Sequence, residues 1–336
     1  MRFTRPRRSI PRRSGARVIA LGLLALTVTA GCAVVDRRAD LNEAQAEARY
    51  PATGQFIEVG GKLVHAHIEG TGPDLVLIHG ASGNTRDFTF ALTRALARDF
   101  RVIVFDRPGL GWTERAPGKF GGVLNRAAES PREQARFLQA AADQLGVTRP
   151  IVLGHSYGGA VALAWGLERP KDTRALVLVA GVALPWPGGL DPMYRVTASR
   201  IGAATVVPLI TAFAPETRVN QAVAGIFAPN PVPPGYLRHV GAGLSLRRES
   251  FRANARQVHQ LRAHMVEMQA HYADLTMPVE ILHGTADTVV PAHIHAEPLA
   301  ARLADARLTL LDGVGHMPHH VDKAAVVAAI HRAAAR

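Results

Sequence analysis

One serine in this chain is predicted to lie where a strand turns sharply into a helix. Residues 154–160 read GHSYGGA and contain the spacing Gly-x-Ser-x-Gly. An apolar run typical of a buried strand, 151–153, precedes this segment, and a run typical of a helix, 160–165, follows it. In so sharp a turn the serine adopts a strained backbone conformation, and its neighbours must be small because other backbone passes close by. The pattern therefore predicts that Ser156 is a nucleophile.

A serine hydroxyl is a poor nucleophile at neutral pH, so it needs a base to take its proton and a carboxylate to orient that base. Asp287 follows a predicted strand, 279–282, and is therefore placed at the carboxyl edge of the sheet. His316 follows another predicted strand, 308–311, after a glycine-rich loop that lets its ring reach the same edge. We expect Ser156 to be the nucleophile, His316 the general base and acid, and Asp287 the orienting carboxylate.

Each of these three assignments has an alternative. Ser156 would otherwise be a structural turn residue, and Asp287 would be a helix cap, with the acid supplied from elsewhere in the chain. His319 and His320 compete with His316 for the role of base. They lie further on, toward the last predicted helix, where they would line the entrance to the site instead.

Strands and helices alternate through most of the chain, whose 336 residues and 48% hydrophobic content allow a large core. A hairpin is predicted at 55–59 and 62–68, followed by buried strands at 75–78, 101–105, 151–153, 175–179, 279–282 and 308–311. Ser130, Pro131 and Glu133 form a helix start with an N-cap and a capping box, and this helix is predicted to end at Leu145. Repeated strand-helix-strand units predict an α/β fold with a doubly wound, mostly parallel sheet.

The alternation stops between residues 183 and 273. Proline and glycine cluster at 185–192 and 229–235, and helical stretches at 193–213 and 245–270 have no strand between them. Because the strand pattern resumes directly afterwards, this segment is interpreted as a helical lid over the carboxyl ends of the strands. A second independent domain is the alternative.

Five landmarks in the order of the chain give residues 51–336 a resemblance to the α/β-hydrolase superfamily. They are His79-Gly80 after a strand, DRPGLG at 106–111 after the next strand, the turn at Ser156, GTAD at 284–287, and Gly315-His316 near the end. The resemblance implies an eight-stranded sheet with a cap inserted after the sixth strand. It divides the chain into a first core part at 51–182, the cap at 183–273 and a second core part at 274–336. The order serine, acid, histidine is also the order this family uses.

The oxyanion that forms after nucleophilic attack needs preorganised hydrogen-bond donors. One is expected to be the backbone amide of Tyr157, which starts the helix directly after the nucleophile, where the helix dipole also helps. The resemblance places the other donor at the amide of Ala81. His79 is expected to be a buried, hydrogen-bonded brace of this turn, and Asp106 to be structural.

The resemblance also limits the reaction. Related haloalkane dehalogenases and epoxide hydrolases use aspartate where this chain has Ser156, so acyl transfer to water is the expected chemistry. We expect a serine hydrolase for a small or medium apolar carboxylic ester or lactone, with Trp186, residues 201–213 and Phe227 forming the acyl pocket. The alternatives are a C–C bond hydrolase or cofactor-free haloperoxidase-like enzyme, and a non-catalytic lipid-anchored binding protein.

Partners other than a small acyl substrate and a membrane are not expected. The sequence contains no phosphate loop, dinucleotide fingerprint or metal-ligand cluster, so no cofactor and no metal are predicted. Seven arginines among the first 17 residues supply +7 of the formal net charge of +12. The remaining +5 does not indicate a nucleic-acid partner.

The amino-terminal residues indicate export from the cell interior. The arginine-rich start is followed by an apolar run, 18–28, that is too short to span a bilayer comfortably, and then by small residues up to Cys32, the only cysteine. This layout resembles the lipobox of bacterial lipoproteins. It predicts a signal peptide at 1–31, a lipid anchor on Cys32, a tether at 32–50 and a location in the cell envelope, at the outer membrane if the source has one. Ordinary secretion and an uncleaved anchor helix are the alternatives.

Overall fold

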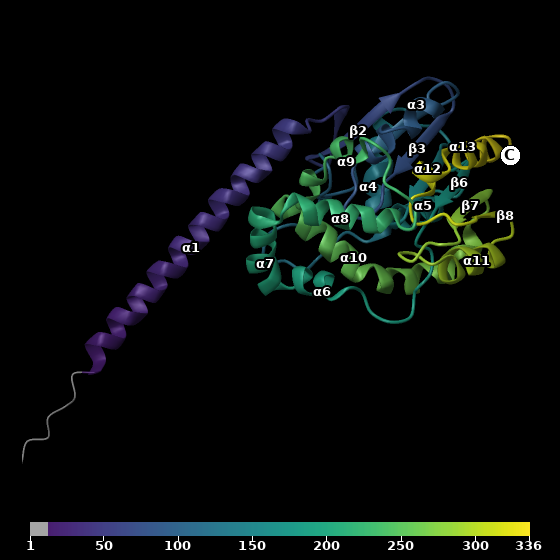
Figure 1. Ribbon diagram of the computed structural model, residues 1–336. Coiled ribbons are helices and arrows are strands. Elements are labelled where there is room, and N and C mark those ends of the chain that lie inside the picture. Colours follow the sequence, from purple (N-terminus) through teal and green to yellow (C-terminus); the bar gives the residue numbers. More distant parts are fainter. Residues whose placement is uncertain (1–12) are drawn as a thin grey trace, which may run out of the picture.

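An eight-stranded sheet forms the centre of this protein (Figure 1). The computed structural model describes residues 13–336, with side chains from residue 21 onward except at 24 and 25. The first twelve residues of the predicted signal peptide lie outside this range. The strands are β1 (Gln55–Val59), β2 (Lys62–Glu69), β3 (Asp74–Ile78), β4 (Arg101–Phe105), β5 (Ile151–His155), β6 (Ala175–Val179), β7 (Val279–Gly284) and β8 (Ala306–Leu311).

The strands are arranged in the order β1-β2-β4-β3-β5-β6-β7-β8. β2 pairs antiparallel with β1 and with β4, and all the other neighbours pair parallel. This confirms the predicted mostly parallel eight-stranded sheet. Because β5 and β7 are parallel and lie on either side of β6, the residues that follow their carboxyl ends meet at one edge of the sheet.

Helices cover both faces of the sheet. They are α2 (Arg86–Thr89), α3 (Leu92–Leu96), α4 (Pro131–Gln144), α5 (Tyr157–Glu168), α11 (Ala292–Arg302), α12 (Pro318–Val321) and α13 (Lys323–Ala334). The side chains of β3 show how the core divides: Val76 and Ile78 pack with α4 and α5, whereas Leu75 and Leu77 pack with α3 and α13. Each strand thus supplies apolar side chains to two separate core clusters, as expected of strands buried on both faces.

A helical cap is inserted between β6 and β7. It consists of α6 (Pro192–Ala198), α7 (Arg200–Phe213), α8 (Glu216–Phe227), α9 (Tyr236–Val240), α10 (Arg248–Met268) and the short 3₁₀ helices η1 (Ala242–Leu246) and η2 (Gln269–Asp274). The predicted helix over 193–213 is in fact two helices. The break lies at Ser199, whose hydroxyl caps α7 by accepting the amide of Gly202 at 3.0 Å.

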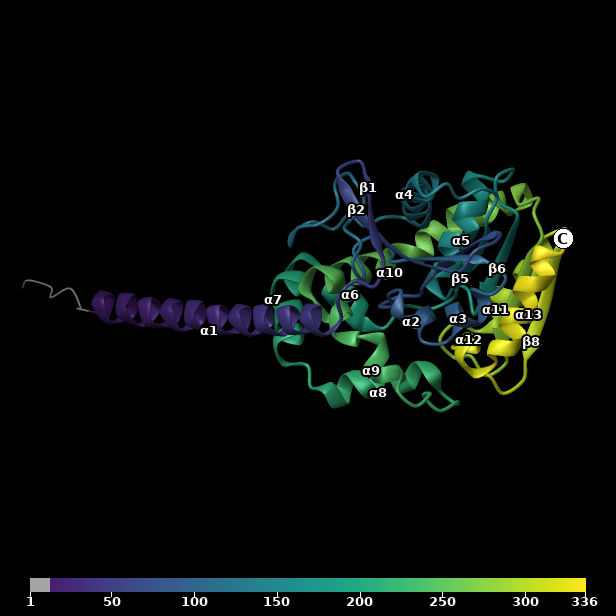
Figure 2. The same ribbon diagram turned by 90° about the horizontal axis from the view of Figure 1, so that it is seen from above.

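One long helix, α1 (Arg13–Arg49), precedes the sheet and projects from the body (Figures 1 and 2). Its last turns lie where a tether is predicted, and they pack on the cap next to α7 and η1. Within the described part of the chain, no single helix has both the length and the apolar character needed to cross a membrane. Only α6 and α7 together meet that test, and they are bent by 107° at their junction.

Candidate active site

Ser156 lies between β5 and α5 with φ 54° and ψ −120°, a conformation that non-glycine residues rarely adopt. The turn is tight enough that its glycines have no room for a side chain. A Cβ at Gly154 would lie 2.1 Å from the carbonyl oxygen of Gly158, and one at Gly158 would lie 2.1 Å from the carbonyl oxygen of Ile78. The backbone of β3 therefore passes directly beside the first turn of α5, and this packing holds the strained serine in place.

The structure brings Ser156, His316 and Asp287 together at the carboxyl edge of the sheet. His316 Nδ1 lies 2.7 Å from Asp287 Oδ2, and His316 Nε2 lies 2.9 Å from Ser156 Oγ. Because a carboxylate only accepts hydrogen bonds, Nδ1 carries a hydrogen and its N–H donates a hydrogen bond to Asp287. Nε2 is then free to accept the serine hydroxyl proton. All three residues are buried, with relative exposures of 8%, 3% and 5%.

Asp287 is held by several donors at once. Its Oδ1 accepts the amides of Val289 and Val290, each at 2.9 Å, and its Oδ2 lies 3.3 Å from His283 Nε2. Burial by itself would raise the pKa of this carboxyl, but the hydrogen bonds from His283, His316 and Val290 outweigh burial and hold the pKa below its usual range. Asp287 therefore stays ionised and can orient the imidazole of His316.

The two residues predicted to donate backbone amides to the oxyanion, Tyr157 and Ala81, lie close to Ser156 in the structure. Tyr157 starts α5, so its amide has no acceptor within the helix and points out of the helix end. The turn at Gly80-Ala81 lies against the nucleophile, since a Cβ at Gly80 would be 3.0 Å from Ser156 Cβ. The positions of Tyr157 and Ala81 are thus consistent with their predicted roles as donors.

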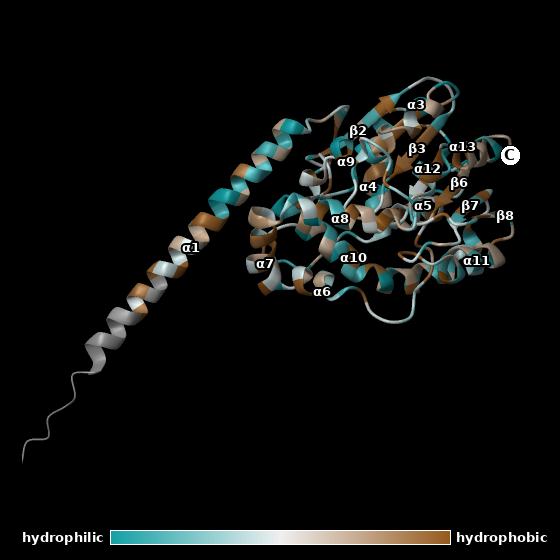
Figure 3. Cartoon of the chain, in the orientation of Figure 1, coloured by the Kyte–Doolittle hydropathy of each residue, from teal (hydrophilic) through white to brown (hydrophobic). Residues whose placement is uncertain are grey.

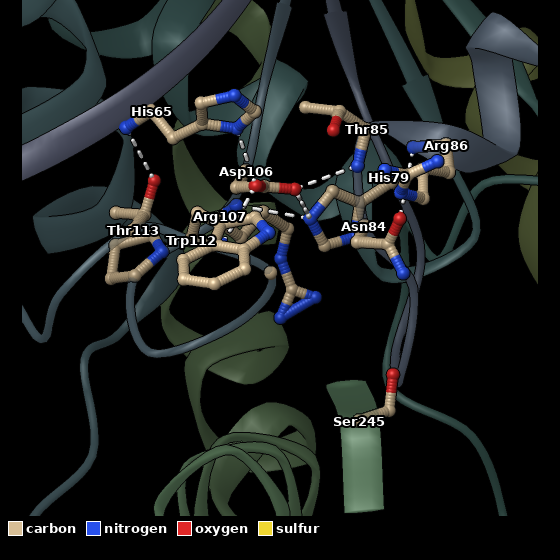
Figure 4. A network of polar contacts seen from close by, with 12 residues as sticks. His65, His79, Asn84, Thr85, Arg86, Asp106, Arg107, Trp112, Thr113 and Ser245 are labelled. Carbon is tan, nitrogen blue, oxygen red and sulfur yellow. Dashed lines mark hydrogen bonds and ion pairs between the residues drawn. The ribbon is translucent and has the colours of Figure 1, made fainter. Parts of the chain in front are cut away.

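His79 and Asp106 lie next to each other in a buried polar network (Figure 4). His79 is fully buried; its Nε2 accepts the amide of Arg107 at 3.0 Å, so its Nδ1 donates to the Gly80 carbonyl at 2.9 Å. Burial, reinforced by the nearby Arg107, lowers the pKa of His79 to about 4. Asp106 accepts the Thr85 amide at 2.6 Å and lies 2.7 Å from His65 Nδ1. Both residues are braces within the fold.

The cap holds the loop directly after the Gly80-Ala81 turn, a contact that the sequence did not predict. Ser82 follows Ala81 and has φ 53°. Its amide donates to Asn254 Oδ1 at 2.7 Å, and Asn254 Nδ2 donates to Ser82 Oγ at 2.9 Å. Ser245 donates its hydroxyl to the Ser82 carbonyl at 2.5 Å. Asn254 lies on α10 and Ser245 on η1, so two cap elements fix the residue next to a candidate oxyanion donor.

Arg107 lies beneath the ring of Tyr157, with its guanidinium carbon 3.9 Å from the ring centroid. The guanidinium also donates to Gln257 Oε1 at 2.7 Å and to the Gly80 carbonyl at 3.3 Å. Burial lowers the pKa of Arg107 to about 10 and raises that of the Tyr157 phenol to about 12. The hydroxyl of Tyr157 accepts from Gln134 at 3.1 Å. The Tyr157 side chain therefore packs into the core, and only its backbone faces the site.

His319 and His320 do not line an entrance, contrary to the sequence interpretation. The side chains of both are buried, and their Nε2 atoms lie 3.1 and 2.8 Å from the two oxygens of Asp87. Tyr236 of the cap donates to Asp87 Oδ1 at 2.7 Å. Next to this cluster, His155 donates from Nε2 to the carbonyl of His316 at 2.9 Å. Since that carbonyl only accepts, His155 fixes the loop that carries the candidate base.

Asp87, His319 and His320 are also the residues best placed to hold a metal ion among those described, because their ligand atoms lie within 4.8 Å of one another. Hydrogen bonds from the two histidines and from Tyr236 already satisfy the carboxylate. We therefore interpret the cluster as a hydrogen-bonded brace between the core and the cap. His295 has a similar role, since its Nδ1 accepts the amide of Leu184 at 3.2 Å where the cap begins.

The apolar residues of the cap are not arranged as the sequence interpretation requires. Ile201, Leu209 and Phe213 are 79%, 47% and 48% exposed on the outside of α7. Phe227 is fully buried, with its ring against Tyr236. Ile201, Leu209 and Phe213 therefore do not line an acyl pocket, because hydropathy gives the amount of apolar surface on a helix and not the direction in which it faces.

Comparisons with known proteins agree with this fold. The sequence profile of the Alpha/beta hydrolase family matches residues 75–330. The 2-hydroxymuconate semialdehyde hydrolase of Pseudomonas putida is 28% identical over 274 residues, which cover 79% of this chain and 88% of that protein.

Two solved structures show the same fold at low sequence identity. The 2-hydroxy-6-oxo-6-phenylhexa-2,4-dienoate hydrolase of Rhodococcus sp. strain RHA1 has a TM-score of 0.67 and 21% identity, covering 84% of this chain and all of that one. A membrane phospholipase A, described as a bacterial virulence factor, has a TM-score of 0.64 and 19% identity, covering 94% of this chain and 99% of that one.

Proposed function

This chain belongs to the alpha/beta hydrolase family, and on that premise we propose that it is a serine hydrolase of small or medium apolar carboxylic esters or lactones. The observation that carries the proposal is the unbroken chain of hydrogen bonds from Ser156 Oγ to His316 Nε2 at 2.9 Å and from His316 Nδ1 to Asp287 at 2.7 Å. A buried serine with a strained backbone and an imidazole nitrogen at hydrogen-bond distance is suited to nucleophilic attack.

In the proposed reaction, His316 Nε2 takes the hydroxyl proton as Ser156 Oγ attacks the carbonyl carbon of the substrate. The amides of Tyr157 and Ala81 stabilise the oxyanion that forms. The protonated His316, held by Asp287, then gives its proton to the leaving alcohol, which leaves an acyl-serine. Water attacks this acyl group with His316 again as base, and the acid product and the free serine are released.

A fluorophosphonate probe together with graded acyl esters and lactones tests this proposal. We expect the probe to label the full chain at Ser156 and the chain to hydrolyse at least one ester. Replacement of Ser156 by Ala should lower kcat by about 10⁴-fold or more and abolish labelling. No labelling of the folded protein would instead support the non-catalytic binding protein, and activity that survives in Ser156→Ala would refute the mechanism.

A C–C bond hydrolase is the second candidate, and the similarity to the Pseudomonas putida 2-hydroxymuconate semialdehyde hydrolase favours it. The name of that substrate denotes a carboxylate, which an arginine in the pocket would bind well. Arg107 lies next to the Gly80-Ala81 turn, but its guanidinium already donates hydrogen bonds to Gln257 and to the Gly80 carbonyl. It is therefore poorly placed to bind a substrate carboxylate. Assays of ring-fission dienoates beside esters separate the two candidates: a kcat/KM at least tenfold higher for a dienoate would favour C–C cleavage.

We further propose that the protein is exported and anchored by a lipid on Cys32. Cys32 is exposed on α1, so its thiol is accessible for modification. Mass spectrometry of the membrane fraction should find a diacylglyceryl group on Cys32, and Cys32→Ser should release or misroute the protein. Unchanged mass and membrane retention in this variant would contradict lipidation and support the uncleaved anchor helix.

A further inference from the structure

The last four turns of α1 are fixed to the cap by specific polar contacts. Arg38 Nε donates to the Ala212 carbonyl at 2.8 Å, and Asn42 Nδ2 donates to the Thr211 carbonyl at 2.9 Å, both at the end of α7. Arg248, at the start of α10, pairs with Glu43 at 2.9 Å and also with Asp36 and Asp40. The direction of α1 is thus set relative to the cap.

The preceding turns of α1 have no such cover. The side chains of residues 21–23 and 26–34 are exposed, and five of them are large and apolar, with relative exposures between 56% and 67%: Leu21, Leu23, Leu26, Val28 and Val34. Cys32 lies one helical turn before Asp36, a rise of about 6 Å along the axis. A lipid on Cys32, or an uncleaved apolar helix, therefore brings the cap to within a few ångströms of a bilayer.

The cap presents an apolar face in this position, which we call the α6–α7 face. It consists of Met193, Val196, Ile201, Leu209 and Phe213, which are between 43% and 79% exposed. On α7 its members are spaced by multiples of four residues, so they share one side of the helix. Both helices lie on the side of the body toward which α1 extends (Figures 1 and 2), and α7 carries hydrophobic colours in Figure 3.

Charges next to the α6–α7 face suit an anionic lipid surface. Arg37, Arg195 and Arg200 are exposed on α1, α6 and the first residue of α7. Among the exposed carboxylates of the same region, Asp36 and Asp40 are paired with Arg248, and Asp191 and Glu216 lie at the starts of α6 and α8. An apolar stripe flanked by arginines on helices that are bent by 107° fits a helix pair that lies in the headgroup region instead of crossing the bilayer.

We infer that the α6–α7 face docks on the anionic lipid bilayer beside α1 and so holds the cap in the membrane interface. The inference rests on the proposed envelope location. It adds a second contact surface with the membrane to the anchor at α1. Asn254 and Ser245 of the cap hold Ser82, next to Ala81. Lipid contact at the α6–α7 face would therefore act on the same cap that holds this part of the site. The substrates favoured by this placement are esters dissolved in the bilayer.

Tryptophan fluorescence with brominated lipids tests the docking directly. Ile201→Trp places a fluorophore on the α6–α7 face of the full chain, and Leu310→Trp places a matched one at an exposed apolar position of β8. In vesicles of phosphatidylethanolamine and phosphatidylglycerol with brominated acyl chains, we expect the emission added at 201 to fall by about half or more and that at 310 to be unchanged. Flotation with the vesicles but no quenching at 201 would overturn the docking alone, and failure to float would overturn both docking and anchoring.

Charge substitution gives a second, independent readout. Ile201→Asp should lower hydrolysis of an ester embedded in phosphatidylglycerol vesicles about tenfold and leave kcat/KM for a short soluble ester within about twofold, with Leu310→Asp as control. If Ile201→Asp changed hydrolysis of the vesicle ester and of the soluble ester by the same factor, the inference would be contradicted. A concentration-dependent dimer of the parent chain that Ile201→Asp dissociates would assign the face to a second copy of the chain, and would also refute lipid docking.

Discussion

The two amides that would bind the oxyanion are held in different ways. The amide of Tyr157 is positioned by its neighbours in the sequence: the strained turn at Ser156, the helix that it starts, and the glycines that let β3 pass beside it. All of these belong to the core. The Ala81 amide lies in a turn that is held in part by the cap: His79 Nδ1 donates to the Gly80 carbonyl, and Asn254, 172 residues away in the sequence, bonds to Ser82.

This difference divides the site into two halves. The core half contains Ser156, Tyr157, Asp287 and His316, and the cap half is the turn of Ala81, which the cap helps to hold. Removing a hydrogen bond from the cap leaves the packing of the sheet edge intact, because Ser156 is held by the backbone of β3, β5 and α5. We expect changes in the core half to alter the chemistry itself. Changes in the cap half should alter how well the oxyanion is stabilised, while the nucleophile and base stay in place.

Asp287→Asn tests the core half and should have the largest effect among substitutions that keep Ser156. Asparagine keeps the size of the side chain, but its amide nitrogen favours the wrong tautomer of His316, so we expect kcat to fall by about 10³- to 10⁴-fold with little change in fold. Single-turnover kinetics on an ester substrate measures this effect, and circular dichroism checks the fold. Asp312→Asn, which changes an exposed aspartate after β8, is the control. A loss of less than tenfold would mean that another acid orients His316.

Three buried histidines should make the fold less stable in acid. Burial is the main cause that lowers the pKa of His79, His295 and His319 to about 4 in the folded state. Between pH 6.5 and 4 the unfolded chain binds protons that the folded chain does not. The free energy of unfolding is therefore at its full value above pH 6.5 and falls by about 1.4 kcal/mol per pH unit per histidine below it.

Urea denaturation at pH 6.5 and pH 5 measures this loss. His295→Asn keeps an acceptor for the Leu184 amide but does not titrate, so it should reduce the loss by about 2 kcal/mol. An equal loss in His295→Asn and in the parent chain would show that His295 titrates normally in the folded protein.

Asn254→Ala tests the cap half. Without its hydrogen bonds to Ser82, the turn that carries Ala81 is free to shift, and we expect kcat to fall about 10- to 100-fold while KM changes little. Asn254→Asp keeps an acceptor for the Ser82 amide and should restore most of the activity. Glu267→Ala, an exposed substitution at the far end of α10, is the control. If Asn254→Ala lowered stability but not kcat in folded protein, the contact would be structural only.

The core half could be predicted from the sequence because its signals are local. The alternating hairpin pattern predicted the first two strands and the apolar runs predicted the other six. Ser130 with Glu133 predicted the start of α4, whose capping box is present. The residues Ser156, Asp287 and His316 each follow a predicted strand, and the parallel order of those strands brings them to one edge.

The cap half could not be predicted in this way. Asn254 and Ser82 are 172 residues apart, and His319 and Asp87 are 232 residues apart, so no short pattern relates them. The outward direction of α7 was also missed, since both of its faces carry apolar residues. The docking of α1 depends on Arg248 pairing with three of the four acids at 32–50, and no local pattern in the sequence relates these acids to Arg248.

The smallest effect on activity is expected when the contacts between the cap and α1 are removed and those between the cap and the active site are kept. Arg248→Gln removes the ion pairs to Asp36, Asp40 and Glu43, of which only Glu43 is mostly buried, so the loss in unfolding free energy should be about 1–2 kcal/mol. Hydrogen exchange should accelerate in residues 36–49, while kcat/KM for a soluble ester should change less than twofold, since Asn254 still holds Ser82. Arg307→Gln on β8 is the matched arginine control. A tenfold loss of kcat in Arg248→Gln would show that α1 supports the cap half of the site as strongly as α10 does, and the division between core and cap would then have to include α1.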